Sequence, residues 1–352
     1  MRFCLYTEEL VPPYDEGYKN FTHALFTQKP AAHDVLCLGC GDTNVFDRQI
    51  EPDKLLRSRE LREVMRGFEP DAVVYLPVAS ATPASFLRAR MLKRHARNAF
   101  VSMIGLQPRK YTPLLRPVLG AIAPDIVYVQ AETSRAALRS FGINAGIVRA
   151  GVDADRFRPV EPAEKARLRE KHGVACDAFV VLHVGHINER RNLRVLADVA
   201  TMPGVQPVVV GSTSTERDAG LAESLRESGV LVLDGYIERI EELYQLSDLY
   251  VFPVMETTGA IEMPLSVLEA MACDLPVVAT RFGGLADQFR EGDGMYLAAD
   301  ADGLVEKMKL ARRSSQASTR AMVLPFTWQA VAADLFSDLE KACRSGQNVG
   351  GC

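Results

Sequence analysis

The sequence predicts an α/β protein in which two doubly wound parallel sheets form two domains. The chain has 352 residues, which is more than one α/β core comfortably holds and suits two. Short apolar runs alternate with segments of helical period, and strands separated by helices pair in parallel. This alternation stops near residue 150, at a stretch rich in glycine and proline, and then begins again. We therefore expect one domain over residues 1–155 and a second over 156–326.

The first domain alternates between strand-like and helix-like segments from its first residues. One helical segment stops at Gly142, and a glycine readily takes the left-handed conformation that ends a helix. Strands are expected at 2–6, 34–38, 71–76, 99–104 and 125–129, and helices around Ala24 and over 57–66, 86–97 and 134–141.

The second domain repeats the alternation after a linker with glycine and several prolines. Strands are expected at 178–184, 206–210, 230–233, 249–252 and 276–279, and helices at 163–172, 192–201, 215–227, 240–246 and 265–273. A last amphipathic helix over 327–343 has Thr327 at its N-cap position. The tail, 344–352, is rich in glycine, serine and asparagine, and we expect it to be disordered. Two such sheets would place ligands where their strand ends face a central cleft.

The composition excludes several classes of protein. Hydrophobic residues make up 47% and charged residues 24% of the chain, as in ordinary globular proteins. No segment approaches the roughly 20 apolar residues of a membrane span, and the N-terminus lacks a signal peptide, so we expect a cytoplasmic protein. Cys37 and Cys40 have the spacing of a redox or zinc pair. Because no second Cys or His pair stands at ligand spacing, we interpret them as strand residues and expect no metal.

Basic residues gather in the segment 88–97, with Arg109, Lys110 and Arg116 downstream. One interpretation is a solvated helix face. The alternative is contact with an anionic membrane surface or a phosphate-bearing acceptor, which would place the protein peripherally at the inner membrane face. We expect no nucleic-acid partner, because the net charge is −4 and no recognition motif is present.

Two loops carry the residues that indicate chemistry. In the first, Gly185 ends a strand, and Arg190 and Arg191 precede a helix, where guanidinium and free backbone N–H groups could bind a diphosphate together. A solvated pair of arginines is the alternative. In the second, Glu269 lies in an Ala- and Leu-rich helix that Pro264 opens. A carboxylate in this position could accept hydrogen bonds from two ribose hydroxyls, or it could simply be exposed.

The second half of the chain resembles the retaining GT-B glycosyltransferases of family 4, the glycosyltransferase group 1 family. Leu265 to Thr280 matches the donor-site motif of that family nearly residue for residue. Further similarities occur in the same order, at 148–159, 185–192, 208–211, 233–236, 247–253 and 326–328. The resemblance covers residues 125–340 well and 1–125 loosely. It implies a GT-B fold of two Rossmann-like domains, with the C-terminal helix packed back on the N-terminal domain.

The resemblance also implies roles for individual residues. Glu269 would hold the donor ribose, and Arg191, at a lysine position of the family, would neutralise the diphosphate without a metal. Glu262 and His186 would complete the catalytic group. Further donor contacts would come from Gly185, Arg190, Gly211, Tyr236, Gly259, Ala260, Ile261, Leu265 and Ser266. The N-domain side of the cleft would contain Gly17, Tyr18, Ser80, Thr82 and Ser102.

The sequence also departs from the family pattern. Ile261 stands where the family has its first glutamate, and Glu262 follows one residue later in a longer loop. His186 replaces an arginine next to the strand-end glycine. The family's histidine near the donor sugar has no clear match, and Ser80, Thr82 and Ser102 are expected at strand ends instead.

The resemblance implies transfer of a hexose-type sugar from a UDP- or GDP-sugar to a hydroxyl acceptor, with retention of configuration and no cofactor. The acceptor would be a glycan, a lipid-linked sugar or a small molecule. Two alternatives stay open: a sugar-nucleotide epimerase or hydrolase, and a silent GT-B protein that binds a nucleotide or a partner. No G-x-G-x-x-G follows any predicted strand, which disfavours a nicotinamide dehydrogenase.

Overall fold

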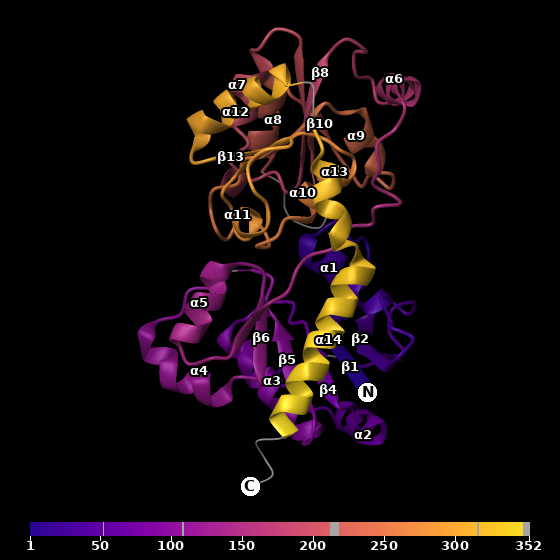
Figure 1. Cartoon of the computed structure of the whole chain (residues 1–352), viewed down its shortest axis with the longest axis vertical. Helices are drawn as coiled ribbons and strands as arrows, with labels where there is room; N and C mark the ends of the chain where they lie inside the picture. The colour runs from indigo at the N-terminus through magenta and orange to yellow at the C-terminus, as the bar shows by residue number, and fades with distance from the viewer. Residues whose placement is uncertain (52, 108, 212–217, 315–316, 348–352) are drawn as a thin grey trace. The chain divides into compact units, whose positions relative to one another are not determined.

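A computed structural model describes residues 1–51, 53–107, 109–211, 218–314 and 317–347. The chain forms two compact units, each with its own parallel sheet (Figure 1). The first unit consists of Met1–Ala150, the short segment Ile261–Met263 and the chain from Trp328 onward. The second unit consists of Gly151–Ala260 and Pro264–Thr327.

The first unit contains a sheet of seven strands in the order β3-β2-β1-β4-β5-β6-β7. Every neighbouring pair is parallel. The strands are β1 (Arg2–Leu10), β2 (Asp34–Gly41), β3 (Arg48–Gln49), β4 (Ala72–Tyr75), β5 (Phe100–Ile104), β6 (Ile126–Val129) and β7 (Ala145–Ile147). The short edge strands β3 and β7 were missed by the sequence pattern, because two or three residues are too few to show a period.

Helices cover both faces of this sheet. The helices are α1 (Gly17–Thr27), α2 (Arg59–Phe68), α3 (Pro83–His95), α4 (Arg116–Ile122) after the 3-10 turn η1 (Pro113–Leu115), α5 (Glu132–Ser140) and α14 (Trp328–Gln347). Apolar side chains of α2, α3, α4 and α5 share one core with the sheet. Helix α14, yellow in Figure 1, packs against β5 and α1. Phe336 of α14 meets Phe3 of β1 edge-on, and Trp328 meets Phe21 of α1 in the same way.

The second unit contains six parallel strands in the order β10-β9-β8-β11-β12-β13. The strands are β8 (Phe179–Val184), β9 (Val205–Val210), β10 (Leu231–Leu233), β11 (Leu249–Phe252), β12 (Val277–Thr280) and β13 (Met295–Ala298). The helical segments are α6 (Pro162–Lys171), η2 (Glu189–Arg191), α7 (Val195–Ala200), α8 (Ala219–Glu227), α9 (Glu241–Leu246), α10 (Leu265–Ala272), α11 (Leu285–Gln288), α12 (Ala301–Arg313), α13 (Thr319–Val323) and η3 (Leu324–Phe326).

The two doubly wound sheets confirm the predicted fold class. Gly142 lies just past α5 with a φ of 76°, as a helix-ending glycine should. Cys37 and Cys40 lie on β2 and are free thiols. Helix α14 begins directly after Thr327 and continues to Gln347, so residues 344–347 are helical rather than disordered. The rest of the predicted tail, 348–352, and the predicted helix start at 215–217 lie outside the described residues.

Candidate functional site

The guanidinium of Arg191 lies buried at the carboxyl end of β8. Gly185 makes room for it: an added Cβ at Gly185 would lie only 2.9 Å from Nη1 of Arg191. The Arg191 residue is 7% exposed, and its Nε has no hydrogen-bond partner. Burial lowers the pKa of Arg191 to about 10, so the group stays charged at neutral pH. No carboxylate among the described residues pairs with it.

Arg169 shows what an equally buried arginine does when it belongs to the framework. It is also 7% exposed, yet all three of its nitrogens donate hydrogen bonds. The acceptors are the carbonyls of Leu246 and Cys176, at 3.0 and 2.8 Å, and Asp248, at 2.6 Å. Buried charges are normally paired in this way. Arg191 differs from Arg169 in that its Nε has no partner and no described carboxylate pairs with it.

His183, on β8, is not among the predicted site residues, because the sequence shows it only as one more position of a buried strand. It is fully buried, and its Nδ1 contacts the carbonyl oxygen of Val251 at 3.0 Å. That contact requires a proton on Nδ1 and leaves the lone pair on Nε2, which has no partner. Burial is the main cause that lowers the pKa of His183 to about 3, and the charge of Arg191 is the second. The ring is therefore neutral. Nothing in the sequence alone distinguishes this histidine from a core residue.

Glu269 projects from α10 with one oxygen available. Its Oε2 accepts a hydrogen bond from the Tyr244 hydroxyl at 2.7 Å, and no described residue donates to Oε1. Burial raises the pKa of Glu269, although the bond from Tyr244 and the charge of Arg156 act against that rise. Tyr250, on β11, hydrogen-bonds with Ser266 and lies near both Glu269 and Arg191. The charge of Glu269 raises the pKa of Tyr250, and the charge of Arg191 lowers it. The two predicted donor-binding residues therefore share one neighbour in the second unit.

The loop after β11 packs against the backbone of the arginine pair. Gly259 lies so close to this backbone that an added Cβ would be 3.0 Å from the carbonyl oxygen of Arg190. At the start of the same loop, the side chain of Asn192 donates to the carbonyl of Pro253 at 3.2 Å. Ala260 and Leu265, which follow in the chain, are buried. The side chain of Arg190 itself is exposed and lies 3.9 Å from that of Glu256.

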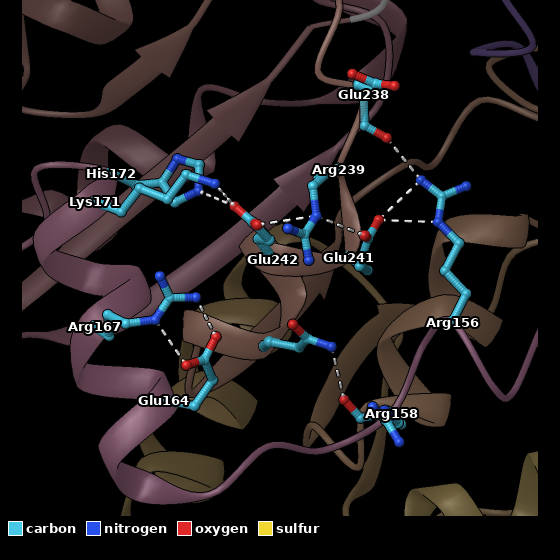
Figure 2. Close-up of polar contacts among 11 residues, drawn as sticks. Arg156, Arg158, Glu164, Arg167, Lys171, His172, Glu238, Arg239, Glu241 and Glu242 are labelled. Atoms are coloured by element: carbon cyan, nitrogen blue, oxygen red, sulfur yellow. Dashed lines mark hydrogen bonds and ion pairs between the residues drawn. The ribbon is translucent and has the colours of Figure 1, made fainter.

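An ionic network lies directly after Tyr236, one of the expected donor contacts (Figure 2). Arg156, from the linker, donates to the carbonyl of Glu238 and to the side chain of Glu241, both at 2.9 Å. The buried Glu242 contacts the cationic groups of Lys171, at 2.6 Å, and Arg239, at 3.1 Å, and the ring of His172, at 2.9 Å.

This arrangement fixes the chain directly after Gly235 and Tyr236. Gly235 has a φ of 93°, which favours glycine, and Tyr236 is exposed. Gly211 follows β9, at the edge of the described residues.

Glu262 lies in a different environment from Glu269. Together with Ile261 it belongs to the first unit, and its carboxylate is at the N-terminus of α5. Its Oε2 accepts from the backbone N–H groups of Gln130, at 2.9 Å, and Ala131, at 3.0 Å, and its Oε1 accepts from the Ser134 hydroxyl. An anion at a helix N-terminus stabilises that helix. The geometry thus gives Glu262 a structural contact, and its catalytic role stays a prediction.

The residues predicted for the N-domain side of the cleft are tied into the first unit by hydrogen bonds. Thr82 caps α3 by accepting from the N–H of Ser85, and Tyr18 donates to the carbonyl of Leu76. Ser80 has a φ of 58° and bonds to the backbone of the neighbouring loop. Ser102 does not lie at a strand end as expected. It is inside β5, fully buried, and donates to the carbonyl of Val73.

Gly17 and His186 complete the predicted set. Gly17 begins α1 and approaches Ile261 so closely that an added Cβ would lie 2.9 Å from that side chain. His186, partly exposed, lies near enough to His183 to help lower the pKa of that ring. Among the described residues, no three His, Cys, Asp or Glu side chains gather as metal ligands would. In the same part of the chain, no helix has the length and apolar character to cross a membrane.

Comparison with known proteins finds glycosyltransferases by sequence. Residues 178–311 match the family described as "Glycosyl transferases group 1". The chain is 30% identical over 271 residues to "Putative glycosyltransferase EpsD" of Bacillus subtilis, a match that covers 72% of this chain and 69% of that protein. It is 32% identical over 186 residues to D-inositol 3-phosphate glycosyltransferase 2 of Catenulispora acidiphila. That match covers 47% of this chain and only 42% of the relative.

Two solved structures show the same fold at low sequence identity. A glycosyltransferase from Rickettsia africae superposes with a TM-score of 0.78 at 14% identity, covering 97% of this chain and 98% of that one. HepE of Anabaena, solved in complex with UDP, superposes with a TM-score of 0.71 at 16% identity over 100% of both chains. Together with the sequence match to EpsD, these likenesses identify the chain as a GT-B protein of the glycosyltransferase group 1 family.

Proposed function

We propose that this protein transfers a hexose-type sugar from a nucleotide-sugar donor to a hydroxyl acceptor with retention of configuration, and that its second unit binds the donor. Membership of a glycosyltransferase family supports the reaction class. The observation that carries the proposal is the buried guanidinium of Arg191, which has no carboxylate partner among the described residues. A donor diphosphate is an anion that would supply one.

Arg191 would act most strongly on the leaving group. As the glycosidic bond breaks, negative charge develops on the nucleoside diphosphate, and a cation fixed in advance stabilises that charge without reorganisation. Because the cation is an arginine, we propose that the reaction needs no divalent metal. Incubation with a chelator should leave the rate of transfer unchanged, and a strict metal requirement would contradict this part of the proposal.

Glu269 would hold the donor ribose. Its Oε2 is already fixed by Tyr244, which orients the carboxylate, while Oε1 is left for a ribose hydroxyl. The chain near Gly235 and Tyr236, fixed by Arg156, would face the base. The acceptor would bind to the first unit, whose loops we propose as the source of acceptor specificity.

A uridine nucleotide is the first donor to test. HepE, whose fold this chain shares, has been solved with UDP and with UDP-glucose, and this supports a nucleotide-sugar donor. The test is a thermal-shift screen with UDP-, GDP-, ADP- and dTDP-sugars. Mass action predicts a rise in melting temperature of several degrees for the true donor at a concentration about 100 times its Kd.

The same screen separates the proposal from the two alternatives. No response to any nucleotide would favour a silent protein that binds a partner. Release of free sugar, or an epimer, without an acceptor would indicate a hydrolase or an epimerase. Arg194→Ala is the matched control, because Arg194 follows Arg191 by three residues but is exposed and pairs with Glu189. Its response to the donor should equal that of the wild type.

A further inference from the structure

Acidic residues are missing from a long part of the first unit. Between Asp71 and Asp125 the sequence contains no aspartate or glutamate, but it contains eight arginines and lysines. This stretch forms β4, α3, β5, η1 and α4. Protein surfaces usually intersperse charges of both signs, so a one-sign stretch of this length creates a local positive field.

The fold itself uses only some of these cations. Arg88 pairs with Glu8 at 2.8 Å, and Lys93 pairs with Asp125 at 2.5 Å. The segment 88–97, considered as a whole, is therefore not an open basic patch. Arg90 and Arg94 are exposed on α3, one turn apart, and no carboxylate among the described residues pairs with either. Leu87, one turn before Arg90 on the same helix face, is exposed as well.

Two aliphatic side chains protrude from the neighbouring segment. Leu114, in η1, is 88% exposed, and Val118, in α4, is 53% exposed. The exposed Arg116 lies between them in the sequence. Single exposed apolar residues are common, but a protruding pair beside unpaired cations is the composition of a surface that enters a lipid headgroup layer.

The structure fixes these two segments side by side. The Tyr111 hydroxyl, just before η1, donates to the carbonyl of Ala81, just before α3. The Tyr111 ring also meets Phe86 edge-on at 6.3 Å. At the other end, Nη1 of Arg90 donates to the carbonyl of Ala121 in α4 at 2.8 Å. Helices α3 and α4 therefore pack against each other.

We infer that this α3–α4 face docks on an anionic lipid bilayer. The face comprises Leu87, Arg90, Arg94, Leu114, Arg116 and Val118. Leu114 and Val118 enter the headgroup layer, and the guanidinium groups stay at the level of the lipid phosphates, where long cationic side chains reach easily. A soluble polyanion would engage the cations alone and would leave both aliphatic side chains in water. The inference does not depend on the donor site, which belongs to the other unit.

The test is cosedimentation of the full chain with vesicles, without donor or acceptor. Wild-type protein should bind vesicles of phosphatidylcholine mixed with phosphatidylglycerol and should not bind phosphatidylcholine alone. High salt should weaken the binding. Arg90→Gln with Arg94→Gln should lower the partition constant about 25-fold, since each cation contributes about fivefold. Leu114→Ser with Val118→Ser should lower it about tenfold or more by removing the apolar contribution.

Leu310→Ser is the matched control, because Leu310 lies in α12 of the second unit and is 51% exposed. Its binding should equal that of the wild type. Full binding by the Leu114/Val118 variant would overturn the inference and would indicate a site for a soluble polyanion. No binding of wild-type protein to anionic vesicles would also overturn it, whereas the donor-induced thermal shift would remain as evidence on the proposed transfer.

Discussion

Two regions of the second unit each bury an arginine to the same extent. In one region the guanidinium has hydrogen-bond partners from the protein, and in the other it lacks a carboxylate partner. Arg169 uses its three nitrogens on two backbone carbonyls and Asp248. Arg191 has no carboxylate partner among the described residues, and its Nε donates to nothing. The first arrangement stabilises the framework. The second leaves a buried charge without a carboxylate partner, at a cost in stability of the free protein.

The two glutamates of the donor-site motif repeat this contrast. Both oxygens of Glu262 accept hydrogen bonds within the first unit, whereas only Oε2 of Glu269 accepts one from a described residue. Glu262 is therefore fully engaged by the fold, whereas Glu269 keeps one oxygen that the proposed donor could engage. This contrast leads to four predictions.

The largest effect is expected at Arg191. Arg191→Met should lower the rate of transfer about 1000-fold, because removal of a fixed charge opposite a developing anion typically costs this much. The folded-state pKa of Arg191 is lowered to about 10, so its charged form destabilises the free protein at neutral pH. The same variant should therefore raise the melting temperature without donor. Calorimetry and initial rates measure the two effects.

The control for Arg191 is Arg169→Met, at the equally buried site. It should lower the free energy of unfolding by about 3 kcal/mol, because the carbonyls of Leu246 and Cys176 and the partly buried Asp248 each lose a donor. The rate per folded molecule should stay unchanged. Equal losses of stability in the two variants would contradict this expectation. They would mean that the hydrogen-bond partners of Arg169 do not stabilise the fold.

Glu269→Ala should weaken donor binding about 100-fold, since hydrogen bonds to a charged group each contribute roughly 1.5–3 kcal/mol. The folded pKa of Glu269 is raised, chiefly by burial. Donor affinity should therefore fall on acidification at a pH above the usual titration range of a glutamate. Tyr244→Phe should move this loss to still higher pH, because the tyrosine hydroxyl stabilises the anion.

Titration calorimetry of the donor across a series of pH values from about 5 to 8 measures this dependence on the raised pKa of Glu269. The raised pKa of Glu269 also predicts how stability depends on pH. As the pH rises through this pKa the carboxylate ionises, and the free energy of unfolding falls. Glu269→Gln should thus leave the free protein as stable as the wild type or more so. A flat pH profile would contradict the assignment of Glu269 to the ribose.

Glu262→Ala should lower the free energy of unfolding by about 2 kcal/mol, because it leaves buried N–H groups of Gln130 and Ala131 without an acceptor. Glu262→Gln should cost less, since the amide oxygen can still accept. Denaturation curves measure both. If the structural contact is the only role of Glu262, the rate per folded molecule stays within about tenfold of wild type; a loss near 1000-fold would restore its predicted catalytic role.

The smallest effect is expected at His183. Its neutral ring fills the space under Arg191 and stacks on Tyr250, with ring centroids 6.4 Å apart. His183→Phe should keep this packing but remove the bond to Val251, and should weaken donor binding by less than about tenfold. Because the pKa of His183 is about 3, the variant should not change the pH profile between 5 and 8, which lies at least about two units above it.

The local sequence pattern was enough to predict much of the second unit. The pattern over Leu265 to Thr280 predicts α10 and β12, and both elements are present. The roles of Arg191 and Glu269 stay predictions. The position of His183 beside Arg191 could not be predicted, because it depends on which residues become neighbours after folding. Glu262 was assigned to the donor from its place in the motif. Its actual partners are more than 120 residues away in the chain, and no local pattern encodes such a contact.

The three residues Ile261–Met263 have a consequence for how the protein is made. They belong to the first unit, as does α14, although the chain between and around them belongs to the second. During synthesis, the carboxylate that caps α5 emerges from the ribosome only after most of the second unit. Domains usually fold as units in order of synthesis. Here the first unit can complete its contacts only after Ile261–Met263 and α14 have been made. An exchange of domains between relatives should therefore carry these three residues and α14 along with residues 1–150.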